Sequence, residues 1–300
     1  MKKTLLLLAI IIAATSCSRN KNGKVLFIGV DGLASWCLET ALDSIPEQIP
    51  NLKALMDKGS WTLEKRAVAP SSSAINWATL MMGVPTELHG YIKWNSRESA
   101  FPPYAKGPNG MPPTLFTLLK EQRPDASSVL IYDWDGVGFV TDTLAIGEHR
   151  YVKWDHQSIE NYAMENAVPV IEAGMPDFYF FYFVEVDERG HKYGWGSPEY
   201  YAALADLDKG LGRILDALES SGEAGNTTIV LTSDHGGKPD RKHGTYDIRD
   251  LRTPLIIAGP GIPQGEIGPM LMQYDVTAFL ATRLGLEKPV WWRGRSDFLK

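Results

Sequence analysis

Short apolar runs alternate with segments of helical periodicity along most of the chain. Five runs of four to nine residues are almost continuously apolar instead of alternating with polar residues. That pattern is typical of strands that are covered on both faces of a parallel sheet. The five runs are Val25–Val30, Val129–Tyr132, Phe178–Val186, Thr228–Thr232 and Leu255–Ala258.

Between these runs, apolar residues recur at the spacing of an amphipathic helix. The longest expected helix covers residues 198–220 and ends before Gly222. Shorter helices are expected over residues 52–59, 114–122, 159–172 and 276–284. Alternating strands and helices predict an α/β fold, with a doubly wound, mostly parallel sheet and helices on both faces. Residues 95–113 are rich in Pro, Gly and Ser without periodicity, so we expect a long surface loop there.

The amino-terminal segment has the pattern of an export signal. Two lysines precede an apolar stretch that is too short to span a membrane, and small residues then lead up to Cys17. That site is similar to the lipid-attachment site of bacterial lipoproteins. We therefore expect residues 1–16 to be a signal peptide, Cys17 to carry a lipid that attaches the protein to the membrane, and residues 17–23 to form a tether. We therefore expect export to the bacterial cell envelope, either in the periplasm or at the outer membrane. The alternative is that the signal peptide is cleaved and no lipid is attached to Cys17.

Composition narrows the class of protein. The chain has 300 residues, 44% hydrophobic content and a net charge of -6, which suits a globular fold without the basic surface that nucleic acid requires. No shift in composition marks a boundary, so we expect a single domain over residues 24–300. Cys17 and Cys37 are the only cysteines, which excludes a disulfide framework and a cysteine-rich zinc site.

Three aspartates stand at or just beyond the ends of expected strands. Asp31 and Asp187 directly follow the apolar runs before them, and Asp234 follows its run two residues later. Open α/β sheets bind ligands outside the carboxyl ends of their strands. The three carboxylates can therefore converge in one crevice, although each could by itself belong to a polar turn.

Three histidines accompany these aspartates. His191 lies four residues after Asp187, a spacing that places both side chains on one face of a helical turn. His235 is adjacent to Asp234, and His243 follows eight residues later. Carboxylate and imidazole together suit zinc, and six such groups are enough for two ions with positions left open for substrate. Each histidine alone could equally be a surface residue.

A run of serines precedes an expected helix. Ser71, Ser72 and Ser73 follow Pro70, and a serine at a helix start is most often a cap. The same position attracts anions, because free N–H groups and the helix dipole point outward. A serine beside a metal ion can act as a nucleophile, and Asn76, one turn later, could donate a hydrogen bond to a phosphoryl oxygen.

The chain resembles the alkaline phosphatase superfamily, and within it the type I phosphodiesterase/nucleotide pyrophosphatase family. The matching stretches, in the order of the family, are VLFIGVDG, APSSSAINWATLMMGVPTELHGYIKWN, FFYFVEVDERGHKYG, VLTSDHGG and KHGTYD. The resemblance implies an alkaline phosphatase-like fold and hydrolysis of phosphoric esters at a site with two zinc ions.

The resemblance also assigns roles to individual residues. It implies that Asp187, His191 and His243 hold one ion, and that Asp31, Asp234 and His235 hold the other together with the oxygen of the nucleophile. Among the three serines it selects Ser73 as the nucleophile, because the family's Thr or Ser stands three residues before an Asn. Asn76 then matches the phosphate-contacting Asn, whereas His89 is expected to be structural.

The chain departs from the family where Ser73 replaces the common Thr and Ala74-Ile75 replaces Phe-Pro. It is also shorter than typical members, which leaves the phosphoester substrate open. Trp94, beside the long loop, is the best candidate for contact with that small molecule. We therefore expect an exported phosphodiesterase or nucleotide pyrophosphatase that forms a phosphoseryl intermediate. A phosphomonoesterase is the alternative, and a sulfatase or a ligand-binding lipoprotein without activity is a more distant one.

Overall fold

A sheet of eight strands forms the centre of the molecule in the computed structural model, which describes residues 23–155, 158–268 and 270–299. The strand order is β4-β3-β5-β1-β6-β7-β2-β8. Their bounds are β1 Lys24–Val30, β2 Ser60–Arg66, β3 Ser128–Tyr132, β4 Glu148–Tyr151, β5 Phe178–Phe183, β6 Thr227–Thr232, β7 Arg252–Ala258 and β8 Gly265–Glu266. The expected signal peptide, Cys17 and most of the tether lie outside the described residues.

The sheet is mostly parallel, as the sequence predicts. β1 pairs in parallel with both β5 and β6, and β3 pairs in parallel with β4 and β5. β7 is the exception among the five strands expected from apolar runs, because it runs antiparallel to β6 and to β2. An apolar run predicts burial of a strand on both faces but carries no information about its direction.

Three strands lack the apolar run that predicts a buried strand. All four residues of β4 are exposed at one edge of the sheet, β8 has only two residues, and β2 carries the charged residues Glu64 and Lys65. β5 also ends at Phe183, earlier than the expected Val186, because α8 begins at Glu185. Asp187 therefore lies in the first turn of a helix.

Each segment of expected helical spacing contains a helix, and further helices lie outside those segments. Their bounds are α1 Ser35–Ser44, α2 Pro50–Lys58, α3 Ser73–Met82, α4 Thr86–His89, α5 Leu115–Gln122, α6 Ile159–Asn166, α7 Val168–Gly174, α8 Glu185–Tyr193, α9 Pro198–Ser220, α10 Ile248–Leu251 and α11 Gln273–Arg283. The helix predicted over 159–172 is divided at Ala167, because Pro169 occupies the first turn of α7 and cannot continue the hydrogen bonding of α6. No described helix is both long and apolar enough to cross a membrane.

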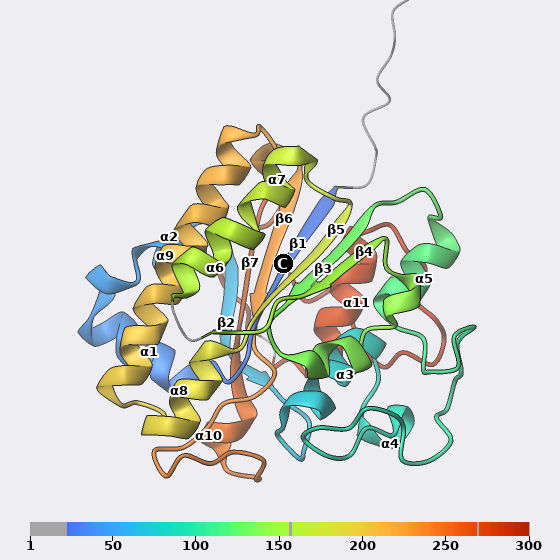
Figure 1. Ribbon diagram of the computed structural model, residues 1–300, viewed down its shortest axis with the longest axis horizontal. Helices are drawn as coiled ribbons and strands as arrows, with labels where there is room; N and C mark the ends of the chain where they lie inside the picture. Colours follow the sequence, from blue (N-terminus) through green and yellow to red (C-terminus); the bar gives the residue numbers. More distant parts are fainter. Residues whose placement is uncertain (1–22, 156–157, 269, 300) are drawn as a thin grey trace, which may run out of the picture.

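The helices lie on both sides of the sheet. Figure 1 shows α2, α6, α7 and α9 on one side and α3, α5 and α11 on the other. The side chain of Trp77, on α3, fills the core against β1 so closely that a Cβ atom at Gly29 would lie 2.6 Å from the indole. Cys37 is fully buried, as expected for a small apolar residue. Residues 91–113 contain no helix or strand, which confirms the long loop.

Candidate functional site

Three buried carboxylates meet at one edge of the sheet. β5, β1 and β6 are neighbours and run in the same direction, so their carboxyl ends lie together. Asp31 follows β1, Asp187 lies on α8 just after β5, and Asp234 follows β6. Their exposed fractions are 1%, 6% and 0%, respectively. The predicted convergence of the three aspartates is therefore present.

The aspartates and histidines form two groups whose ligand atoms lie within 4.8 Å of one another. Asp31, Asp234 and His235 form the deeper group, and all three are buried. Asp187, His191 and His243 form the outer one. Nε2 of His235 lies 3.3 Å from Asp31 Oδ1 and 4.0 Å from Asp187 Oδ1, so the two groups adjoin. These are the same two triads that the family resemblance implies.

All three histidines point the same ring nitrogen into the site. Nδ1 of His191, His235 and His243 lies 3.3, 2.8 and 2.9 Å from the backbone carbonyl oxygens of Arg241, Gly236 and Ser71. A carbonyl oxygen only accepts hydrogen bonds, so each Nδ1 carries a proton, and Nε2 is the nitrogen of each ring that is left to bind a ligand. Nε2 of His191 and Nε2 of His243 lie 3.1 Å apart. When neither nitrogen carries a proton, both can ligate one metal ion.

The carboxylates are held in a way that leaves oxygens free on the same side. Asp31 Oδ2 accepts hydrogen bonds from Trp77 Nε1, at 3.0 Å, and from the Tyr182 hydroxyl, whereas Oδ1 faces His235. Asp234 Oδ1 accepts from the backbone N–H of Gly32 at 3.2 Å. Oδ2 of Asp234 and Oδ1 of Asp187 are buried without a hydrogen-bond donor among the described residues. Buried oxygens of this kind call for a cation.

The protonation of these groups reflects a surplus of buried negative charge. Burial, together with neighbouring carboxylates, raises the pKa of Asp31 and of Asp234 well above the usual range. Burial also raises the pKa of Asp187, but the hydrogen bond from His191 and the histidine charges outweigh it and set the pKa at about 2. The same hydrogen bond raises the pKa of His191 to about 9, whereas burial lowers that of His243 to about 3.

These observations fit divalent metal ions. The donor set consists of carboxylate oxygens and neutral imidazoles, which suit zinc and related ions. Each imidazole is oriented by a backbone carbonyl, which is the usual arrangement behind a metal-ligating histidine. Positive charge in each group would satisfy the two free carboxylate oxygens and the facing histidine nitrogens at once.

Ser73 is the serine whose hydroxyl lies against the deeper group of ligands. It is the first residue of α3, and its Oγ lies 3.1 Å from His235 Nε2 and 3.4 Å from Asp31 Oδ1. The Ser71 hydroxyl instead donates to the carbonyl oxygen of Thr245 at 2.8 Å. Of these two serines, Ser73 is therefore the one whose hydroxyl contacts the ligand groups, and Ser72 lines the cavity beside it.

Asn76 departs from its expected role. Its Oδ1 accepts from the N–H of Val68 at 2.8 Å, and its Nδ2 donates to the carbonyl oxygens of Val68, Pro70 and Ser72 at 3.1 to 3.3 Å. The side chain is fully buried, and these bonds occupy both ends of the amide. Asn76 thus ties the loop before Ser73 to α3 and has no group left for a phosphoryl oxygen.

A cavity of about 650 Å³ opens beside Ser73 and the outer group of ligands. Trp94, the predicted substrate contact, lines it and is 60% exposed. Trp134 also lines it, as do two cations: Arg241, whose carbonyl oxygen faces His191 Nδ1, and Lys242, which precedes His243 in the chain. Trp134 follows an expected strand by two residues, so its place in the sequence could have indicated that it lies at the site. No pattern in the sequence indicates the same for Arg241 and Lys242.

Two further buried groups lie close to the site without facing it. His89 is structural, as expected, because its Nδ1 accepts from the N–H of Tyr91 at 3.0 Å and its Nε2 contacts the Thr79 hydroxyl at 3.0 Å. Lys65 is fully buried behind Asp234, and its Nζ donates to the carbonyl oxygen of Ser233 at 3.0 Å.

Comparison with curated proteins identifies snake venom phosphodiesterases as relatives. The chain is 26% identical over 237 residues to venom phosphodiesterase CdcPDE of Crotalus durissus collilineatus, and 27% identical over 238 residues to that of Macrovipera lebetinus. Each match covers about three quarters of this chain, 74% and 75%, but only 27% of the relative. A shorter match, 44% identical over 72 residues, joins 22% of this chain to 14% of a sulfatase of Formosa agariphila.

Solved structures share the fold. Murine ectonucleotide pyrophosphatase/phosphodiesterase 5, in an inactive form with AMP, superposes with a TM-score of 0.69 at 16% identity, covering 93% of this chain and 100% of that one. BT4656, with its substrate D-glucosamine-2-N,6-O-disulfate, gives a TM-score of 0.69 at 15% identity over 93% and 80% of the two chains. The sequence profile described as type I phosphodiesterase / nucleotide pyrophosphatase matches residues 25–254. Because this match covers most of the chain, the protein belongs to the type I phosphodiesterase/nucleotide pyrophosphatase family, in the alkaline phosphatase superfamily.

Proposed function

We propose that the protein is a phosphodiesterase or nucleotide pyrophosphatase that uses two zinc ions and a phosphoseryl intermediate. The observation that carries the proposal is the position of the Ser73 hydroxyl, 3.1 Å from His235 and 3.4 Å from Asp31, where the two groups of ligands adjoin. Membership of the family supports this reaction. The murine relative solved with AMP supports a nucleotide among the substrates to test.

The residues of the chain suit two successive in-line displacements. Ser73 Oγ forms a bond to phosphorus while the bond to the leaving oxygen breaks, and its proton departs to the surroundings. Water then displaces Ser73 and releases the phosphorylated product. When bound, the two ions supply positive charge to the phosphoryl oxygens. Trp77 and Tyr182 hold Asp31 in the orientation that faces Ser73.

The test is Ser73→Ala, assayed with bis(p-nitrophenyl) phosphate and with bound zinc measured in parallel. Loss of a nucleophile should lower kcat by at least about 1,000-fold, while two equivalents of zinc remain bound. Ser35→Ala is the matched control, because Ser35 is also a buried serine in the first turn of a helix and its hydroxyl has no hydrogen-bond partner within the described part of the chain. Full activity of the Ser73 variant would disprove its role as nucleophile.

A phosphomonoesterase is the second candidate, and two cations favour it. Arg241 and Lys242 line the cavity next to the outer ligands, where they could bind the additional negative oxygen of a monoester. Arg241 has a φ of 68°, a left-handed conformation that is uncommon for a side chain of this kind. Rates on p-nitrophenyl phosphate and bis(p-nitrophenyl) phosphate decide between the two activities. We expect faster diester hydrolysis, and a preference for the monoester would favour the second candidate.

A sulfatase is the more distant alternative, since BT1596, a 2-O GAG sulfatase, shares the fold. The sequence lacks the Pro and Arg that follow the modified residue of those enzymes at fixed offsets after Ser71, Ser72 or Ser73. Mass spectrometry of the intact protein tests this directly. An unmodified Ser73 supports the phosphoesterase, whereas an aldehyde at that position would support a sulfatase.

We also propose that the protein is an exported lipoprotein of the bacterial cell envelope, with one catalytic domain over residues 24–300. The basic and apolar start of the chain and the small residues before Cys17 support this proposal. Mass spectrometry of the mature amino terminus tests it. A diacylglycerol-modified Cys17 is the expected result, and an unmodified Cys17 at the amino terminus would indicate cleavage without lipid attachment.

A further inference from the structure

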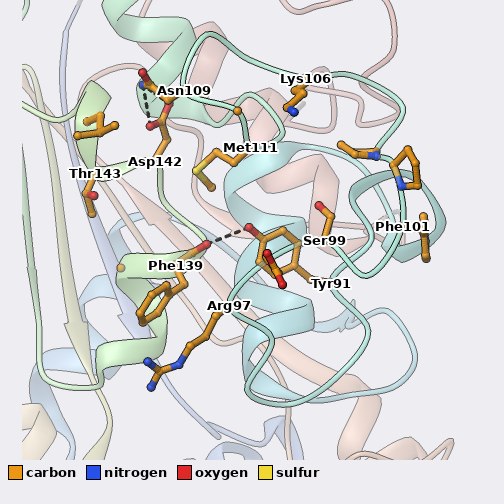
Figure 2. A pocket seen from close by; sticks show the side chains of 16 residues that line it. Tyr91, Arg97, Ser99, Phe101, Lys106, Asn109, Met111, Phe139, Asp142 and Thr143 are labelled. Atoms are coloured by element: carbon orange, nitrogen blue, oxygen red, sulfur yellow. Dashed lines mark hydrogen bonds between the residues drawn. The ribbon is translucent and has the colours of Figure 1, made fainter.

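A second cavity, of about 620 Å³, lies beside the site already described and shares none of its lining residues. Figure 2 shows its two walls, which are the long loop from Tyr91 to Met111 and the segment from Gly138 to Leu144. Its volume is within the usual range for small-molecule sites, about 300 to 1,000 Å³. The size of the cavity therefore suits a small-molecule ligand.

The walls are built and joined by specific contacts. Asn109 Nδ2 donates to both carboxylate oxygens of Asp142, at 2.9 and 3.1 Å, and the Tyr91 hydroxyl donates to the carbonyl oxygen of Phe139 at 3.0 Å (Figure 2). Asp142 is buried and has a φ of 46°, a left-handed conformation that Asp adopts more readily than most residues. Strained backbone of this kind persists where the surrounding contacts hold it, as in ligand clamps.

The lining combines apolar rings with polar groups and has no net charge. Two cations, Arg97 and Lys106, are balanced by two anions, Glu98 and Asp142. The lining also includes Phe101, which is 40% exposed and can pack against a ring face, and Phe139, whose ring is already covered on one face by the Arg97 guanidinium. Asn109 keeps its amide oxygen as an acceptor after its Nδ2 has bonded Asp142. Together these groups suit an uncharged ring that carries hydroxyl groups.

The cavity lies close to the reacting serine. The N–H of Ala74, next to Ser73, donates to the carbonyl oxygen of Trp94 at 3.0 Å. Trp94 lines the first cavity, and Arg97, three residues later, lines the second. Three residues of chain span at most about 10 Å. Arg97 also pairs with Asp135 at 2.8 Å and lies over the ring of Phe139, so one wall connects the two cavities.

We propose that this second cavity is a subsite for an uncharged, hydroxylated ring such as a pyranose sugar, carried by one substituent of the phosphodiester. The proposal rests on the proposed function only for the link to substrate, because binding of a free sugar can be measured without catalysis. It narrows the substrate class to diesters in which a sugar ring lies a short distance from phosphorus.

Binding is tested by saturation-transfer NMR titrations of the metal-loaded full chain with methyl glucoside, methyl glucuronide and uridine. The glucuronide differs from the glucoside by one carboxylate, so it tests the argument from charge. We expect the glucoside to bind at least as tightly as the other two. If only the glucuronide binds, the cavity is an anion site at Lys106. If only uridine binds, it is a nucleoside site. Either result would overturn the proposal.

Phe101→Ala tests the location of the subsite. Loss of the exposed ring should weaken glucoside binding by about three- to tenfold without unfolding the protein. Tyr246→Ala is the control, because Tyr246 is an 83% exposed aromatic residue that lines neither cavity. Unchanged glucoside affinity in the Phe101 variant would overturn the assignment.

Kinetics separate failure of the subsite from failure of the proposed function. In Phe101→Ala, KM should rise for a diester that carries glucose and stay unchanged for bis(p-nitrophenyl) phosphate. A wild-type protein that hydrolyses bis(p-nitrophenyl) phosphate but shows no effect of Phe101→Ala on the glucose diester contradicts the subsite alone. A wild-type protein that binds glucoside but hydrolyses neither diester contradicts the proposed function alone.

Discussion

Tyr182→Phe removes a single hydroxyl group behind the deeper group of metal ligands. Tyr182 lies on β5, is fully buried, and donates its hydroxyl to Asp31 Oδ2, which also accepts from Trp77 Nε1 at 3.0 Å. The substitution keeps the ring, and so keeps its edge-to-face contact with Trp77, with centroids 5.1 Å apart. Asp31 Oδ2 would then accept a hydrogen bond from one donor, Trp77, instead of two.

The expected effect follows from the strength of a hydrogen bond to a charged group. Such a bond contributes about 1.5 to 3 kcal/mol, and removal of one that orients a metal ligand typically costs about 10- to 100-fold in metal affinity. Burial and the charge of Asp187 already raise the pKa of Asp31, and the Tyr182 hydroxyl opposes them. The variant should therefore bind zinc about 10- to 100-fold more weakly at the deeper group.

The pH dependence has a definite sign. Loss of the Tyr182 hydroxyl raises the pKa of Asp31 further, so a proton competes with the metal ion up to a higher pH. Zinc affinity of the variant should therefore fall off at a higher pH than that of the wild type. Competition with a chromogenic chelator across a pH series measures both effects, and the outer group of ligands should keep its affinity.

Tyr162→Phe is the matched control. Tyr162 is also buried beside β5, but its hydroxyl has no hydrogen-bond partner among the described residues. Removal of that hydroxyl should leave zinc affinity and its pH dependence unchanged. If Tyr182→Phe binds both zinc ions as tightly as the Tyr162 variant throughout the pH series, the argument that Tyr182 orients Asp31 is wrong.

Three further predictions test other parts of the structure. In the metal-free protein, burial lowers the pKa of Lys65 from 10.5 to about 7. Between these two pH values the folded state binds fewer protons than the unfolded state, so the free energy of unfolding should rise with pH. Urea titrations across this pH range should show the rise in the wild type and not in Lys65→Met. Asn76→Ala should lower the free energy of unfolding by about 2 to 4 kcal/mol, because the buried N–H and carbonyl groups of Val68 lose their hydrogen-bond partner. A variant that loses activity while its stability is unchanged would instead indicate that Asn76 contacts the substrate. Removal of metal with a chelator should abolish diester hydrolysis and lower Tm, and zinc should restore both; activity that survives removal of all metal would contradict the proposed chemistry.

Much of the fold could be predicted from local pattern. The five apolar runs became β1, β3, β5, β6 and β7, because strands covered on both faces need uninterrupted apolar residues. The bounds of α9 match the predicted 198–220, since its apolar spacing is regular. The polar edge strand β4 and the direction of β7 were not predictable, because pairing depends on neighbours that are distant in sequence.

The sequence by itself determined which residues could form the site. Asp31, Asp187 and Asp234 follow three neighbouring strands, so any parallel arrangement of those strands brings them to one edge. The family resemblance then divided the ligands into two triads, and the structure brings together the same two groups.

Only the tertiary structure decided what surrounds those ligands. Tyr182 reaches Asp31 across 151 positions of the chain, and Arg241 reaches His191 across 50, so no local pattern could pair them. Asn76 shows the same limit at short range, because the conformation of the loop before Ser73 turns its amide toward the backbone instead of the cavity. Sequence spacing identifies groups that can converge, whereas the directions of their side chains depend on contacts made only after the chain has folded.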